Sequence, residues 1–137
     1  MSVLNDVAAF LSAQGLGTVG VDIFIGFLPA TPTPCCAVFE YGGSAPSGGF
    51  GTYGTVYEKP AVQVVFRGSP EDYLGPRTKA QTAFRALHAV APGALPGVTP
   101  STPNYLLITP NQQPFIMERD ANRCVKIACN YSCEKEP

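Results

Sequence analysis

The stretch CVKIACNYSC, residues 124–133, alternates between apolar and polar side chains along most of its length. A period of two is the pattern of a β-strand buried mainly on one face, because successive side chains point to opposite sides of a sheet. It predicts one face with Val125, Ile127, Cys129, Tyr131 and Cys133 and an opposite face with Lys126, Asn130 and Ser132. We therefore expect the domain to be built on a sheet.

Shorter apolar runs predict the other strands. They lie, in chain order, at residues 21–25, 35–41, 62–67, 105–108 and 115–117. The second of these runs, CCAVFEY, is closed by Gly42 and Gly43. The sequence Asp120-Ala121-Asn122 favours a hairpin turn that leads into the last strand.

A first helix is expected near the start of the chain, where apolar residues recur at intervals of three and four. Its N-cap is Ser2, and Gly15 and Gly17 end it. The apolar face consists of Val3, Leu4, Val7, Phe10 and Leu11.

A second helix is expected to start at the tetrapeptide SPED, residues 69–72, which supplies a cap, a proline and two acids for the positive helix end. The dipeptide Gly75-Pro76 leaves two alternatives open: a short turn with a restart at Pro76, or one kinked helix. Pro92-Gly93 ends the helix, and its apolar stripe consists of Ala80, Ala83, Phe84, Leu87 and Ala91.

This order of elements predicts one α/β (α+β) domain over residues 1–137: a mixed, mostly antiparallel sheet of about five strands with two main helices packed on it. Two connections stand out. Residues 42–57 form a glycine-rich loop that carries Phe50 and Tyr53, and residues 92–103 form a proline-rich connector. A long loop with aromatic side chains is suited to contacts with a neighbouring protein.

The composition favours a protein that assembles with others. Charged residues make up only 14% of the chain, against about 25% in typical soluble domains. The net charge of −1, with no basic cluster, argues against direct DNA binding. No apolar run is long enough to span a membrane and no secretory leader is evident, so we expect a protein made and used in a cytosol.

The sequence offers little for catalysis, so we expect no enzyme, no cofactor and no metal site. The single histidine, His88, has no candidate nucleophile or carboxylate near it in the sequence. Five cysteines lack the paired spacing of zinc knuckles and are interpreted as buried free thiols: Cys35, Cys36, Cys124, Cys129 and Cys133. The glycine-rich loop has neither a following Lys-Ser/Thr pair nor a helix start whose amides could complete a nucleotide site.

Four stretches, taken in order, resemble the tail terminator, or minor capsid, proteins of long-tailed bacteriophages and prophages. They are DVAAFLSAQGLGTVGVDIFIGFLP, YEKPAVQVVFRG, FRALH and YLLITPNQQPFIMERDANRCVKIACNYSCEK. The most specific parts are the turn at residues 13–18, the lead into a strand at residues 57–60 and the segment at residues 113–120.

The resemblance implies a structural role in the virion, at the junction of tail and neck, after assembly in the host cytoplasm. It implies a homo-hexameric ring that caps the head-proximal end of the tail tube, stops polymerisation and offers a docking face to the head-tail connector or head-closure protein. Genome DNA passes through such a ring without specific binding. The candidate interface residues are Phe50 and Tyr53 of the loop and three arginines at strand ends, Arg67, Arg119 and Arg123.

Three alternatives stay open from the sequence. The chain could be another neck component, such as a head-closure or tail-completion protein. It could be a small monomeric binding module of the toxin or immunity type. It could also be a thiol-dependent enzyme that pairs one cysteine with His88.

Overall fold

The structure is a computed structural model that describes residues 3–48, 55–88, 90, 95 and 104–136. In this part of the chain there are two helices, α1 (Val3–Ala13) and α2 (Leu74–His88). The same residues form six strands: β1 (Ile23–Ile25), β2 (Cys35–Gly48), β3 (Thr55–Pro70), β4 (Tyr105–Pro110), β5 (Phe115–Arg119) and β6 (Cys124–Lys135).

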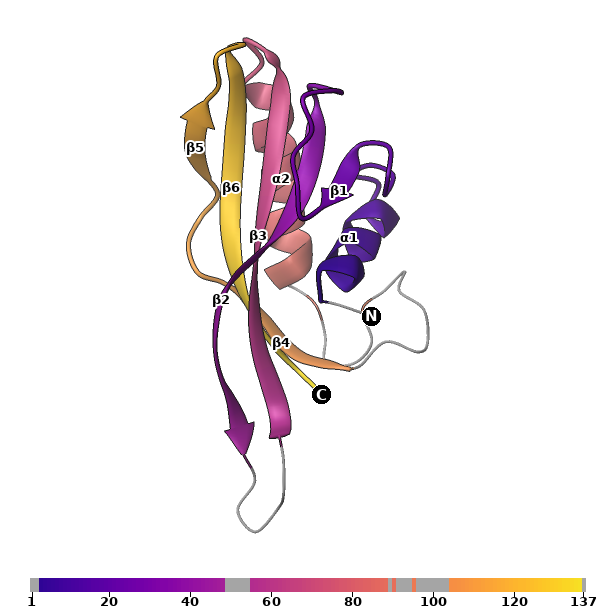
Figure 1. The fold of residues 1–137 in the computed structure, drawn as a ribbon, viewed down its shortest axis with the longest axis vertical. Helices are drawn as coiled ribbons and strands as arrows, with labels where there is room; N and C mark the ends of the chain where they lie inside the picture. The colour runs from indigo at the N-terminus through magenta and orange to yellow at the C-terminus, as the bar shows by residue number, and fades with distance from the viewer. Residues whose placement is uncertain (1–2, 49–54, 89, 91–94, 96–103, 137) are drawn as a thin grey trace.

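All six strands belong to one sheet with the order β1-β2-β3-β6-β4, and β5 pairs with β6 beside β4. Only the pair of β1 and β2 is parallel. Figure 1 shows that the long strands β2, β3 and β6 run along the longest axis of the molecule. The predicted fold class, a mostly antiparallel sheet with two helices, is confirmed.

The core lies between the helices and one face of the sheet. Helix α1 packs on β1, β2 and β3, whereas α2 packs on β3, β4 and β6 (Figure 1). The alternation expected at residues 124–133 is confirmed, since its five predicted core residues all lie in the hydrophobic cluster. The opposite sheet face is partly buried too, because Cys124 and Ala128 are inaccessible.

Helix α1 ends where its glycines predict. The amide of Leu16 donates to the carbonyl of Leu11, and the amide of Gly15 donates to the carbonyl of Ser12. With Gly15 at φ 79°, this is a Schellman motif, which glycine makes without strain. Leu16 is thereby turned into the core.

Helix α2 begins at Leu74 and not at residues 69–72 as expected, because β3 continues to Pro70. From Leu74 it is one continuous element through Gly75-Pro76. The side chain of Asp72 accepts a hydrogen bond from the amide of Gly75 at 3.0 Å, so Asp72 is the N-cap. Pro76 then falls in the first turn, where proline is tolerated. A Cβ on Gly68 would approach Pro76 to 2.8 Å, which explains the glycine where β3 passes the helix.

Strand β1 is shorter than expected. Residues 21–25 alternate like a strand, yet only Ile23–Ile25 are paired, and Val21 is exposed. The carbonyl of Thr18 accepts from three successive amides, those of Val21, Asp22 and Ile23, and this turn keeps Val21 out of the ladder.

The glycine-rich segment is strand over much of its length, which corrects the loop expected at residues 42–57. Strand β2 continues to Gly48, and β3 begins at Thr55. The two strands form an arm that extends past the helices (Figure 1). Their pairing is interrupted by register shifts after Tyr41, and at Gly43 a Cβ would lie 2.4 Å from the carbonyl oxygen of Lys59.

Several sequence predictions fall on residues beyond the described part of the chain, among them the N-cap Ser2, Ala91 of the second apolar stripe and the helix end at Pro92-Gly93. Phe50 and Tyr53 belong to the segment 49–54, which the structure does not describe. Of the proline-rich connector at residues 92–103, the structure describes only Leu95, which is buried in the core.

Candidate assembly surfaces

Arg67 of β3 is bound within the subunit. It is 7% exposed and lies opposite Cys35 on the neighbouring strand. Its Nε donates to the carbonyl oxygen of Thr33 at 2.8 Å, and its Nη2 donates to that of Pro32 at 2.8 Å and to that of Pro29. The guanidinium thus ties the segment 29–33, which precedes β2, to the sheet. The predicted interface role of Arg67 stays a prediction.

The β5–β6 hairpin has the turn that the sequence predicts. One carboxylate oxygen of Asp120 accepts from the amides of Asn122 and Cys124, at 2.9 and 3.0 Å. These backbone hydrogen bonds, that of Cys124 first, lower the pKa of Asp120. The carboxylate therefore stabilises the turn at neutral pH and fixes where β5 ends.

The two other candidate arginines flank this turn. Arg123 has φ 62° and pairs with Glu71 at 2.6 Å, both side chains being well exposed. Such an exposed pair contributes roughly 0–1 kcal/mol. Arg119, at the end of β5, is exposed and has no ion-pair partner among the described residues. Arg119 is therefore the candidate with a free charge.

One edge of the sheet, formed by β4 and β5, exposes a row of large apolar side chains. All five residues of β5 are exposed. An exposed apolar edge strand favours association with another chain. We call this surface the β5 edge; its apolar residues are Leu106, Leu107, Phe115, Ile116 and Met117.

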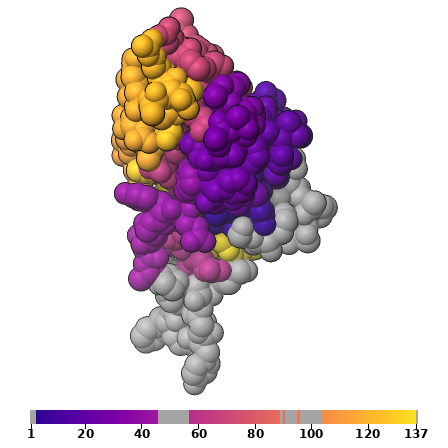
Figure 2. Space-filling model, turned by 45° about the horizontal axis from the view of Figure 1, so that its top comes forward, coloured from indigo at the N-terminus to yellow at the C-terminus, as the bar shows by residue number. Residues whose placement is uncertain are grey.

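The opposite edge, formed by β1 and the outer side of β2, has an apolar groove of about 290 Å³. Val19 and Phe27 are exposed on it, and Phe27 packs against Phe24 with ring centroids 5.5 Å apart. We call this surface the β2 edge; its groove is lined by Val19, Gly20, Ile23, Phe24, Ile25 and Phe27. In Figure 2 the N-terminal segment and the C-terminal strands occupy different sides of the molecule.

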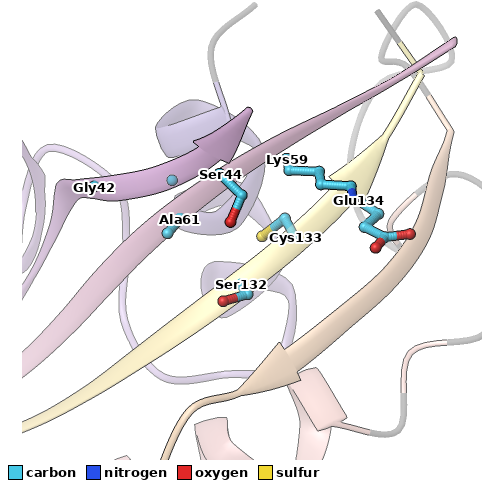
Figure 3. Close-up of a pocket in the computed structure, with 8 residues that line it drawn as sticks. Gly42, Ser44, Lys59, Ala61, Ser132, Cys133 and Glu134 are labelled. Carbon is cyan, nitrogen blue, oxygen red and sulfur yellow. The ribbon is translucent and has the colours of Figure 1, made fainter. Parts of the chain in front are cut away.

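A polar hollow of about 190 Å³ lies at the base of the arm, where β2 bulges away from β3. Figure 3 shows the Lys59 side chain pointing toward Glu134, with Ser44 and Cys133 to one side of the pair. The hollow is smaller than the roughly 300–1,000 Å³ of typical ligand sites. It offers room for water between the strands.

The five cysteines are free and buried, as the sequence predicts. Burial raises the pKa of each thiol, that of Cys133 to about 12. Thiols held in the neutral form are poor nucleophiles and poor metal ligands. Within the described residues no group of His, Cys, Asp or Glu could hold a metal ion.

We expect the native chain to resist thiol modification. At pH 8, iodoacetamide should label the five cysteines at least ~100-fold more slowly than a free thiol, since both burial and the raised pKa oppose attack. Mass spectrometry should find all five alkylated in guanidinium chloride. Rapid labelling of one native cysteine would contradict this and revive the thiol-enzyme alternative.

His88 ends α2 in an exposed position and stacks on Phe84, with ring centroids 6.3 Å apart. The described residues place no thiol in hydrogen-bonding contact with its ring. No helix in the described part of the chain has the length and apolar content to cross a membrane.

The fold and its surfaces define a class: a small α+β protein with apolar patches on both sheet edges. The family model for the bacteriophage tail terminator protein matches residues 10–133. The chain belongs to this family, as its resemblance predicts, and is a structural protein of the phage virion. A comparison with curated proteins finds no match.

Proposed function

We propose that the chain forms a homo-hexameric ring at the head-proximal end of the tail tube. There it stops tube polymerisation and offers a docking face to the head-tail connector or head-closure protein. The observation that carries this proposal is the family match over residues 10–133. The two apolar edges support it, because a ring needs two different surfaces on each subunit.

The proposed ring encloses a lumen through which genome DNA passes without specific binding. The net charge of −1 supports this, since tight binding to a phosphate backbone requires clustered cations. The β2–β3 arm, with Phe50 and Tyr53 in its connecting segment, is proposed to contact the tube or a neighbouring subunit. Assembly takes place in the host cytoplasm, and the ring stays at the tail-neck junction.

The test is to remove the gene from a phage or prophage that encodes this chain and to image the tails by electron microscopy. We expect overlong tubes without heads, because nothing ends their growth, and tails of uniform length when the chain is supplied in trans. Gold-labelled chain should lie only at the head-proximal end. Tails of normal length that fail to join heads would instead assign the chain to head closure or tail completion.

A further inference from the structure

The two sheet edges carry backbone groups that no described strand pairs with. On β5, the pairing with β6 uses one side of the strand from Phe115 to Arg119 and leaves the other side open. On β2, the pairing with β1 ends at Val38, although β2 runs on to Gly48. Within the described residues, unpaired backbone groups therefore lie at both ends of the sheet, along β5 at one end and along β2 beyond Val38 at the other.

The open ladder of β2 can be placed residue by residue. The amide of Cys36 donates to Asp22, and the carbonyl of Val38 accepts from Gly26, so both face the β1 side. Because backbone groups alternate along a strand, those of Glu40 face the same way, just past the end of β1. This is where another strand can continue the sheet.

Charges at the two edges are complementary. Glu40 and Arg119 are both exposed, and neither has an ion-pair partner among the described residues. Arg119 lies opposite Val125, and Glu40 lies two residues beyond Val38. Val38 and Val125 both belong to the core, so the two charged side chains leave the sheet on its helix-covered face.

We propose that the β5 edge of one copy packs against the β2 edge of the next copy, so that the sheet continues from subunit to subunit. Arg119 then faces Glu40, and the apolar β5 edge covers the groove beside β1. The interface is heterologous, and repetition of it closes a ring. This inference rests on the proposed function, and it names the two surfaces that the ring would use.

A variant with two added cysteines tests the contact in assembled tails. It is called the two-cysteine chain, after its added cysteines alone, because the five native thiols are buried. The chain with Glu40→Cys and Arg119→Cys is treated with a short bis-maleimide, which bonds two thiols by addition to its two alkenes. We expect a ladder of covalent multimers that ends at the closed ring. Either single-cysteine variant should stay at 14.4 kDa, because the two positions meet only between copies. The same chain with Thr82→Cys in place of Arg119→Cys is the matched negative control.

Disruption of the apolar contact supplies a second measurement. Adding Ile116→Arg to the two-cysteine chain should reduce the multimers at least ~10-fold, because an unpaired cation would be buried at the interface. Adding Thr82→Arg, on the exposed side of α2, should leave the ladder unchanged. Circular dichroism checks that both chains are folded. If Ile116→Arg unfolds, the smaller change Met117→Thr takes its place.

The outcomes separate the inference from the function on which it rests. Cross-linked dimers from a single-cysteine variant would show an isologous contact and overturn the inference. A chain that ends tails but gives no ladder would also overturn it, while the proposed function stands. If tails end normally without the chain, the proposed function fails whatever the ladder shows.

Discussion

Replacing Arg67 with alanine should lower the free energy of unfolding by about 3 kcal/mol. The side chain is buried and donates to three carbonyl oxygens, those of Pro29, Pro32 and Thr33. A hydrogen bond from a charged group contributes about 1.5–3 kcal/mol, and water can satisfy part of the lost contacts, since these carbonyls lie near the surface. Urea denaturation followed by circular dichroism measures the change.

Two matched variants show whether the effect comes from this geometry. Arg67→Lys keeps the charge but loses the planar fork that reaches several carbonyls at once, so about half of the loss should remain. Arg119→Ala removes an exposed arginine and should change stability by less than about 0.5 kcal/mol. If Arg67→Ala lowers the free energy of unfolding no more than Arg119→Ala does, the guanidinium does not hold the segment 29–33 before β2.

The role of Arg67 shows where sequence-based prediction stops. Its position in a strand follows from the alternation around Val64 and Phe66, and the structure agrees. Its acceptors are backbone carbonyls 34 to 38 residues away, and any residue type presents a carbonyl. No side-chain pattern in the sequence could therefore have predicted these hydrogen bonds.

The sequence predicts a loop where the structure has the arm, because the pairing of these residues also depends on contacts that their side chains do not signal. Strand signals come from apolar alternation, and residues 42–48 consist largely of glycine and serine. They are in a strand because β3 offers a paired partner and because Gly43 allows the backbones to approach closely. Likewise Ile116 was placed in a strand from its sequence, but only the strand order shows that this strand is an edge.

The second large effect concerns the contact between α1 and β4. The hydroxyl of Tyr105 donates to Oδ2 of Asp6 at 2.7 Å, and both side chains are almost inaccessible. The other carboxylate oxygen of Asp6 has no hydrogen-bond partner among the described residues. Tyr105→Phe therefore leaves a buried carboxyl group without its donor, and we expect a loss of about 2 kcal/mol in unfolding free energy.

A double-mutant cycle isolates this pair. The variants are Tyr105→Phe, Asp6→Ala and their combination, and we expect a coupling energy of about 1–2 kcal/mol. Tyr41→Phe, which removes an exposed hydroxyl, is the control and should have almost no effect. Additive losses in the cycle would show that Tyr105 stabilises the core through its ring alone.

The pH dependence gives an independent check. Burial, and after it the hydrogen bond to Asp6, raises the pKa of Tyr105. A group with a raised pKa contributes its full stability below its unfolded-state pKa, about 10 for tyrosine, and loses it as the pH rises above that value. The original chain should therefore lose stability above pH ~10 more steeply than Tyr105→Phe. Equal slopes would mean that the hydroxyl ionises as freely in the native state as in the unfolded chain.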